Sequence, residues 1–203
     1  MSVDHLRKLL LAGVLCITAI QAHAVENQAC IECHGGKKSP AVHSYTTSKH
    51  GAIMQIERDD YDWQQPLTSA NYRVPGCSYC HMQQGGHNVN TMDIAKVCQD
   101  CHAPRYIREL FANGEDMLEI ARKKVREANA LVAQAAEIFT NTQLEPTIKI
   151  MQAMKQHLTN VKLGVGHQSP DYQWWHGQAA LDGDLLRIKG YIGDLYRKKN
   201  LGG

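Results

Sequence analysis

The sequence predicts a mainly α protein in two parts, a loop-rich N-terminal region followed by a C-terminal bundle of long helices. Beyond about residue 105, hydrophobic residues recur at heptad and helical spacing. Before that point, Gly, Asn and Gln are frequent and periodicity is weak, with Gly-Gly and Pro-Gly pairs marking turns. We therefore expect three segments: a leader at 1–24, a loop-rich region at 25–104 and a helical region at 105–203.

The leader has the order of a secretory signal peptide. Arg7 and Lys8 precede an apolar run at 9–20, and the small-residue site Ala22-His23-Ala24 follows. We expect cleavage after Ala24 and an exported, periplasmic location. An uncleaved membrane anchor is the alternative, but the run is shorter than the ~20 apolar residues that a spanning helix needs. The neighbours of Cys16 are a poor context for lipoprotein acylation.

The other six cysteines all fall in C-x-x-C-H runs, with none left over. The three runs are Cys30-Ile-Glu-Cys33-His34, Cys77-Ser-Tyr-Cys80-His81 and Cys98-Gln-Asp-Cys101-His102. This pattern is typical of c-type haem attachment. Two thiols add to the porphyrin vinyl groups, and the following histidine becomes the proximal iron ligand.

A disulfide framework or zinc sites are the competing interpretations of paired cysteines. Neither requires a histidine directly after the second cysteine. We therefore expect three covalently bound haem c groups, with His34, His81 and His102 as proximal ligands. The region 25–104 is then a loop-rich multihaem c-type cytochrome region that folds around its haems.

The helical region begins with a coiled-coil-like seam. Its heptad positions are Leu118, Val125, Val132 and Phe139, with small residues at Ala121, Ala128 and Ala135. Asn113-Gly114 is a possible break near the start of this helix. The pattern favours an intramolecular bundle over a purely intermolecular coiled coil.

Two further helices follow. Pro146 suits a helix start, and a second hydrophobic stripe runs to the stop signals Gly164 and Gly166. Ser169-Pro170-Asp171 is another start signal. The second stripe comprises Ile148, Met151, Met154, Leu158 and Val161, and the third comprises Leu181, Leu185, Ile188, Ile192 and Leu195.

Histidines are numerous enough to supply a second ligand for every haem. The spare histidines after the leader are His43, His50, His87, His157, His167 and His176. We predict His50, His87 and His167 as distal ligands, with His43 and His176 in reserve. Methionine ligation is the alternative and would raise the potential; the available residues are Met54, Met92, Met151 and Met154.

Several motifs, in order, resemble the hydroxylamine oxidoreductase family of multihaem cytochromes. They cover nearly the whole chain after the leader and resemble the C-terminal, three-haem portion of that family. The motifs are Val42-His43-Ser44-Tyr45-Thr46-Thr47-Ser48-Lys49-His50-Gly51, Pro75-Gly76-Cys77-Ser78-Tyr79-Cys80-His81-Met82 with Gly86-His87, Cys101-His102-Ala103-Pro104-Arg105-Tyr106, and His167-Gln168-Ser169-Pro170-Asp171-Tyr172-Gln173-Trp174-Trp175-His176-Gly177.

The resemblance implies electron transfer but not a complete enzyme. Members of the family carry eight haems and bind substrate at a five-coordinate haem in the N-terminal half, which has no counterpart here. A family tyrosine modifies the catalytic haem of a neighbouring subunit, and Tyr172 matches it in position. The family's corresponding helices build a trimer, which implies a possible homo-oligomer through the C-terminal helices.

Charge excludes one class of partner. The formal net charge is +2, with no basic block, which argues against nucleic-acid binding. Three functions stay open: a periplasmic electron carrier with bis-histidine haems, a small electron-transfer subunit of a hydroxylamine-oxidoreductase-like complex acting on small nitrogen compounds, and an independent enzyme. We expect a redox protein partner, for which a larger multihaem enzyme is one candidate, and no stable membrane span after cleavage. We assign no catalytic residue.

Overall fold

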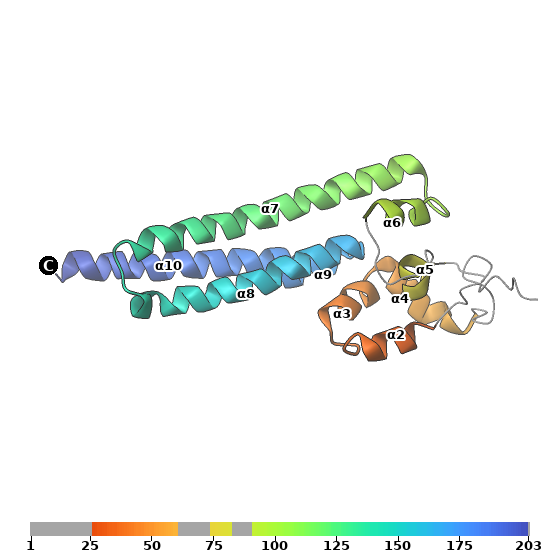
Figure 1. Cartoon of the computed structure of the whole chain (residues 1–203), viewed down its shortest axis with the longest axis horizontal. Coiled ribbons are helices and arrows are strands. Elements are labelled where there is room, and N and C mark those ends of the chain that lie inside the picture. Colours follow the sequence, from red (N-terminus) through yellow and green to blue (C-terminus); the bar gives the residue numbers. More distant parts are fainter. Residues whose placement is uncertain (1–25, 61–73, 83–90, 203) are drawn as a thin grey trace, which may run out of the picture.

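The computed structural model describes residues 26–60, 74–82 and 91–202. The predicted signal peptide at 1–24 and the predicted ligand His87 lie outside the described residues. Every regular element within the described residues is helical, which confirms the mainly α fold class. The chain forms an elongated molecule, with short helices at one end and three long helices extending from them (Figure 1).

The cysteine-containing end is built from short helices. They are α2 (Asn27–Cys33), α3 (Pro40–Thr46), α4 (Lys49–Glu57), the 3₁₀ turn η1 (Arg58–Asp60), α5 (Cys77–His81) and α6 (Thr91–Cys98). Serine side chains start two of them. Ser39 accepts a hydrogen bond from Val42 N, and Ser48 accepts one from Gly51 N. These caps fix where α3 and α4 begin, and so place the histidines that each helix carries.

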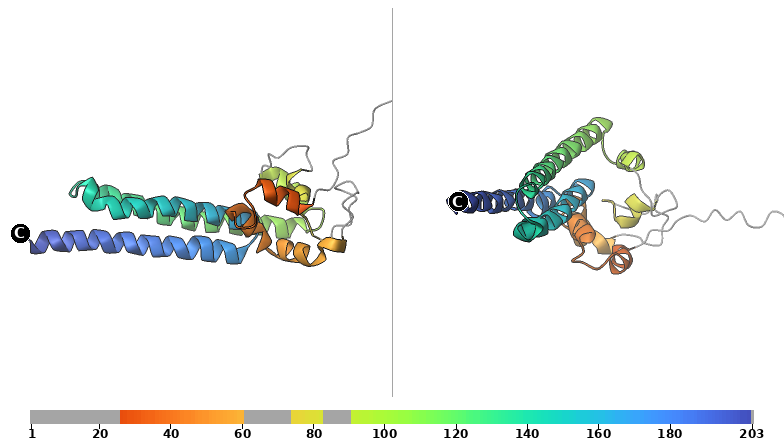
Figure 2. Two further views of the ribbon diagram at one scale, coloured as in Figure 1. Left: turned by 90° about the horizontal axis from the view of Figure 1, so that it is seen from below. Right: turned by 60° about the vertical axis from the view of Figure 1, so that its left-hand side comes forward.

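The other end is an antiparallel bundle of α7 (Pro104–Ala136), α8 (Asn141–Gly166) and α10 (Ala179–Leu201). Helix α7 runs from the cysteine region to the far tip, α8 returns, and α10 runs out again to the C-terminus (Figures 1 and 2). Each helix packs against the other two. Among the described residues, no helix is long and apolar enough to cross a membrane.

The predicted hydrophobic stripes meet inside this bundle. Ala121, Ala128 and Ala135 are fully buried in the same core cluster as Leu181 and Ile188. The alanines let α7 approach its neighbours closely, because a small side chain leaves room for the facing ridge. The small-residue seam is therefore used within the chain, as the intramolecular interpretation predicts.

Two predicted boundaries within the helical region were wrong. Helix α7 continues unbroken through Asn113-Gly114, where a Cβ on Gly114 would lie 2.7 Å from Val165 Cγ1. That glycine serves helix contact and does not end the helix. Helix α8 starts at Asn141, not at Pro146, because Thr140 and Gln143 form a reciprocal capping box.

A short, compact connection joins α8 to α10 at the end of the bundle nearest the cysteine motifs. It contains the short helix α9 (Pro170–Gln173) and a π-helical turn, η2 (Trp174–Gln178). Gln178 is buried there, accepts a hydrogen bond from Lys124 Nζ at 2.9 Å and donates one to Met117 O at 2.8 Å. These bonds tie the connection to α7. Turns of the π type are frequent at functional sites.

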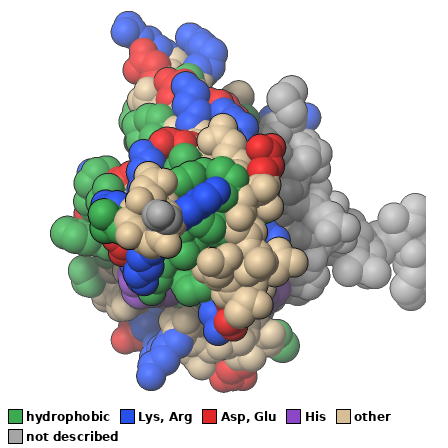
Figure 3. Space-filling view, turned by 90° about the vertical axis from the view of Figure 1, so that its left-hand side faces the viewer, with side chains coloured by type: hydrophobic (Ala, Val, Ile, Leu, Met, Phe, Trp, Pro, Cys, Tyr) green, Lys and Arg blue, Asp and Glu red, His purple; other side chains and the backbone are tan. Residues whose placement is uncertain are grey.

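The opposite tip of the bundle presents hydrophobic side chains among Lys and Arg (Figure 3). A hollow there is lined by Phe139, Leu195, Lys198 and Lys199, among others. Since this tip is far from the cysteine motifs (Figure 1), the candidate site lies at the other end of the molecule.

Candidate haem-attachment and ligand site

Each C-x-x-C-H motif lies at the end of a short helix. The first motif closes α2, the second fills α5, and the third runs from the end of α6 into the following turn. In the first and third motifs, the histidine N–H donates to the carbonyl of the first cysteine, from His34 to Cys30 and from His102 to Cys98, at 2.9 Å in both. The same turn therefore sets the two cysteines and the histidine of both motifs.

The three motifs form a continuous series. The thiols of Cys30 and Cys77 lie close enough to shift each other's pKa, which joins the first motif to the second. Cys80 lies beside Cys98, which joins the second motif to the third. The second motif is thus in the middle, and we infer that haems attached to these thiols would follow the same order.

No disulfide joins any two of the six described cysteines. Burial raises the pKa of Cys77 to about 12, and burial together with the nearby Cys98 raises the pKa of Cys80 to about 12. The thiolate is the form that exchanges disulfides, so this reaction is disfavoured at these two residues. Within the described residues, no three His, Cys, Asp or Glu side chains gather as a metal-ion site.

Two predicted distal histidines lie opposite proximal histidines. The ring centres of His50 and His102 are 6.0 Å apart, and those of His81 and His167 are 6.3 Å apart. A metal–imidazole bond of about 2.0 Å on each side, together with the radii of two five-membered rings, places ring centres about 6 Å apart across one metal ion. The spacing of both pairs therefore fits one iron between two imidazoles.

Burial favours the neutral form of both distal candidates, which is the form that binds a metal. Burial, followed by the charge of His102, lowers the pKa of His50. Burial, followed by the charge of His81, lowers the pKa of His167 to about 4. A neutral imidazole has a nitrogen lone pair available for ligation.

His167 occupies a strained helix end. It caps α8, and the next residue, Gln168, has a φ of 55°, the one non-glycine residue with positive φ in the described part of the chain. Ser169 N donates to Gly164 O at 2.8 Å, which closes a Schellman-type turn. The left-handed residue costs about 1–2 kcal/mol, so the surrounding contacts must hold this turn in place.

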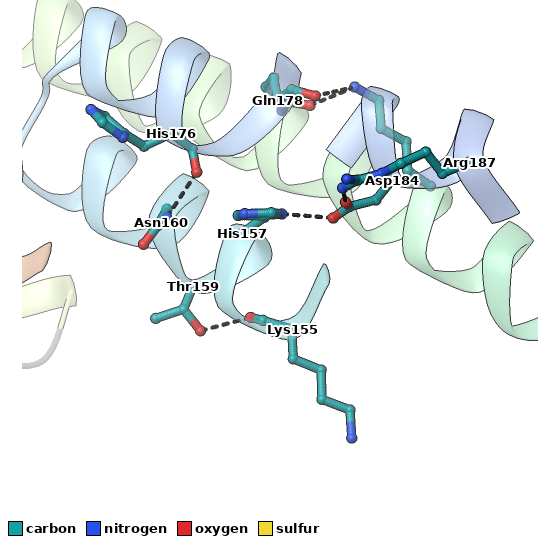
Figure 4. Close-up of polar contacts among 9 residues, drawn as sticks. Lys155, His157, Thr159, Asn160, His176, Gln178, Asp184 and Arg187 are labelled. Atoms are coloured by element: carbon teal, nitrogen blue, oxygen red, sulfur yellow. Dashed lines mark hydrogen bonds and ion pairs between the residues drawn. The ribbon is translucent and has the colours of Figure 1, made fainter. Parts of the chain in front are cut away.

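The reserve histidines lie elsewhere. The rings of His43 and His176 are 5.1 Å apart, and both contact Tyr172, at 5.3 and 4.7 Å. Tyr172 is buried and donates to Asn160 Oδ1, while Asn160 Nδ2 donates to His176 O at 2.8 Å (Figure 4). Tyr172 is thus turned into its own chain. The structure pairs the reserve histidines with each other and with Tyr172.

Other predicted candidates have structural partners. His157 lies 2.7 Å from the buried carboxylate of Asp184 (Figure 4). Met154 is fully buried in the bundle core, and Met54 packs near Gly76 in the cysteine region. The side chain of Met92 lies outside the described residues.

Sequence reasoning missed Asn27, which connects the first two motifs. Its Oδ1 accepts from Cys77 N at 2.8 Å, and its Nδ2 donates to Tyr45 Oη, whose hydroxyl donates to Pro75 O. Gly76 makes this contact possible, because a Cβ there would lie 2.7 Å from Asn27 Oδ1. The Pro75-Gly76 pair signalled a turn, but nothing in the sequence pointed to Asn27.

Comparisons with known proteins agree with the motifs. A family model described as "Seven times multi-haem cytochrome CxxCH" matches residues 16–97. A probable nitrite reductase-hydroxylamine oxidoreductase fusion protein of Kuenenia stuttgartiensis is 35% identical over 84 residues, covering 37% of this chain and 10% of that protein. A solved chain of a reducing HAO-like protein complex from the same organism has a TM-score of 0.62 at 17% identity, covering 87% of this chain and 57% of that one.

The three attachment motifs and the family model over residues 16–97 both point to a multihaem c-type cytochrome. The chain is similar to hydroxylamine-oxidoreductase-like (HAO-like) multihaem proteins, which confirms the resemblance seen in the sequence. The solved relative shares the fold, and the chain spans only about a tenth of the fusion protein and 57% of the solved chain.

Proposed function

We propose that this chain is an exported, periplasmic cytochrome with three covalent haem c groups, which passes electrons between redox partners through bis-histidine haems. The carrying observation is the pair of facing imidazoles, His50 with His102 at 6.0 Å and His81 with His167 at 6.3 Å. Haem c supplies a one-electron iron couple. The chain's own histidines would close both axial positions, which disfavours binding of a substrate to the iron.

The third haem would be attached through Cys30 and Cys33 with His34 as its proximal ligand. His87 is our candidate for its distal ligand, since His50 and His167 each face a different proximal histidine. The reserve residues His43 and His176 are less suited, because their rings contact each other and Tyr172.

The test is low-temperature electron paramagnetic resonance of the oxidised holoprotein. We expect low-spin signals from all haems. His50→Ala and His167→Ala should each convert one haem to a high-spin state, because each removes one axial ligand. His176→Ala is the matched control, since His176 is exposed and faces no proximal histidine in the described residues. An unchanged low-spin spectrum in either ligand variant would remove that residue from the assignment.

A high-spin haem in the unmodified protein would favour an enzyme instead.

Export has its own test, which is the N-terminal sequence and cell fraction of the mature protein expressed from the full chain. We expect a periplasmic protein beginning at Val25. Cytoplasmic holoprotein that retains residues 1–24 would contradict this part of the proposal.

A second candidate function is a small electron-transfer subunit of an HAO-like enzyme complex that acts on small nitrogen compounds. The observation in its favour is that the solved relative is part of a reducing HAO-like protein complex. Affinity purification from the native source separates the two functions. A larger multihaem protein that copurifies in fixed ratio favours the subunit, and an isolated haem protein favours the carrier.

A further inference from the structure

Helix α3 contacts the bundle at the turn that carries His167. Ser44, on α3, is fully buried, and its Oγ lies 2.7 Å from His167 Nδ1, although the two residues are 123 positions apart. A second hydroxyl contact lies beside it, between Thr47 Oγ1 and Ser169 Oγ at 3.0 Å. Two contacts from one helix thus hold both sides of the His167 turn.

The direction of the Ser44–His167 hydrogen bond follows from the other partner of Ser44. Ser44 Oγ donates to Ala41 O at 2.8 Å, and a carbonyl oxygen can only accept. A serine hydroxyl has one hydrogen and two lone pairs. With that hydrogen directed to Ala41, the Ser44 oxygen is left to accept, so His167 Nδ1 is the donor.

We propose that Ser44 is a positioning residue that holds His167 as the Nδ1–H tautomer, which leaves its Nε2 lone pair free to bind iron opposite His81. The inference rests on the proposed function, because it assigns a role to a residue that contacts the ligand. Metal-binding histidines commonly donate their other ring N–H to a nearby oxygen, and this bond sets the tautomer, the ring orientation and the basicity of the ligand. A more basic imidazole favours the ferric state and lowers the potential.

The test is spectropotentiometric titration of the holoprotein with Ser44→Ala, Ser44→Thr and Thr46→Ala. We expect Ser44→Ala to raise the midpoint potential of one haem and leave the others unchanged. A tenfold loss in the preference of His167 for ferric over ferrous iron equals about 59 mV for a one-electron couple. Ser44→Thr keeps the hydroxyl and should restore the potential. Thr46→Ala, which removes only a local bond to His43 O on the same helix, is the matched control.

A second measurement needs no variant. In the reduced protein with ¹⁵N-labelled histidine, His167 should give an Nδ1–H resonance that exchanges slowly with water, because the donor is buried against Ser44. A His167 ring protonated on Nε2, or an Nδ1–H that exchanges as fast as an exposed one, overturns the proposal even if Ser44→Ala fails to mature.

The outcomes separate this inference from the proposed function. If His167→Ala leaves every haem low-spin, His167 is not a ligand and both fail. If His167→Ala opens one haem while Ser44→Ala lowers stability without moving any potential, Ser44 only packs against the turn. In that case the bis-histidine proposal stands and the role of Ser44 is overturned.

Discussion

Replacing Gly164 with alanine should drive apart two helices that meet behind His167. A Cβ added at Gly164 would lie 2.6–2.7 Å from Cβ, Cα and N of Gln173 on α9. Non-bonded carbon atoms prefer about 3.5–4.0 Å, so the new methyl group intrudes by about 1 Å. Two of the three crowded atoms are backbone, so the clash cannot be relieved by rotating a side chain.

The expected size follows from two opposing effects. Overpacking costs about 1–3 kcal/mol, and the backbone clash places this site at the upper end. Alanine recovers about 1 kcal/mol because it favours a helix over glycine. The net loss is about 2 kcal/mol, or about 4–8 °C in melting temperature for a chain of this size. His167, between the two displaced elements, should shift with them and give a partial high-spin signal.

Thermal melting by far-UV circular dichroism and the haem spectrum are the two readouts. Gly166→Ala is the matched control, because it lies two residues away with nothing within 4 Å of its added Cβ. That variant should be unchanged or stabilised by about 0.4–1 kcal/mol. The reasoning is refuted if Gly164→Ala has the same melting temperature as Gly166→Ala and keeps a fully low-spin spectrum. In that case the close approach of α8 and α9 does not hold His167.

Four further outcomes are expected. Denatured protein from a host with cytochrome c maturation should retain a mass excess of three haems; two or fewer would refute the count. Ala128→Leu should destabilise the bundle by about 1–3 kcal/mol because Ala128 is fully buried, whereas the exposed Ala130→Leu should not. Asp184→Asn should cost about 1–3 kcal/mol because it weakens the hydrogen bonds of a fully buried carboxylate to the partly exposed His157 and Arg187, against less than about 1 kcal/mol for the exposed Asp194→Asn; equal melting temperatures would contradict this. Gln168→Gly should raise stability by roughly 0.5–1 kcal/mol because glycine tolerates its positive φ.

Association through the C-terminal helices stays a prediction. The buried alanine seam is used inside the chain, so it offers no surface to a partner. Exposed hydrophobic residues on the outer surface, such as Ile120, Leu186 and Tyr191, remain available. We expect analytical ultracentrifugation of the holoprotein at micromolar concentration to detect an oligomer. A clean monomer that binds no haem protein would return the bundle to a purely internal role.

The attachment motifs and the long helices could be predicted because each is a local pattern. A haem-attachment motif must be close in sequence, as in Cys30, Cys33 and His34, because its residues bind one haem. A heptad stripe repeats within a single helix. Boundaries were less certain. Gly114 and Pro146 carry breaker signals, yet α7 and α8 continue through them, because packing against Val165 and a capping box upstream outweigh the local preference.

The pairing of distal histidines was beyond the sequence because it depends on tertiary contacts. His50 faces the third motif and not the one nearest in sequence, and His167 reaches the second motif from the end of α8, late in the chain. Nothing in the spacing of His43 or His176 separated them from these ligand candidates. The contact of Ser44 with His167 could not be predicted either, because a single buried serine gives no recognisable sequence pattern.

The order of the three motifs would give the molecule two outer haems and one middle haem. The first and third motifs each contain an exposed cysteine, Cys33 and Cys101, whereas both cysteines of the second, Cys77 and Cys80, are half-buried. On the proposed haem order, a partner protein would dock near the first or the third haem. The middle haem would receive electrons only from these two haems. A substitution in one docking surface would then stop electron exchange with the partner that binds there. The haem at the other end would still exchange electrons with its own partner.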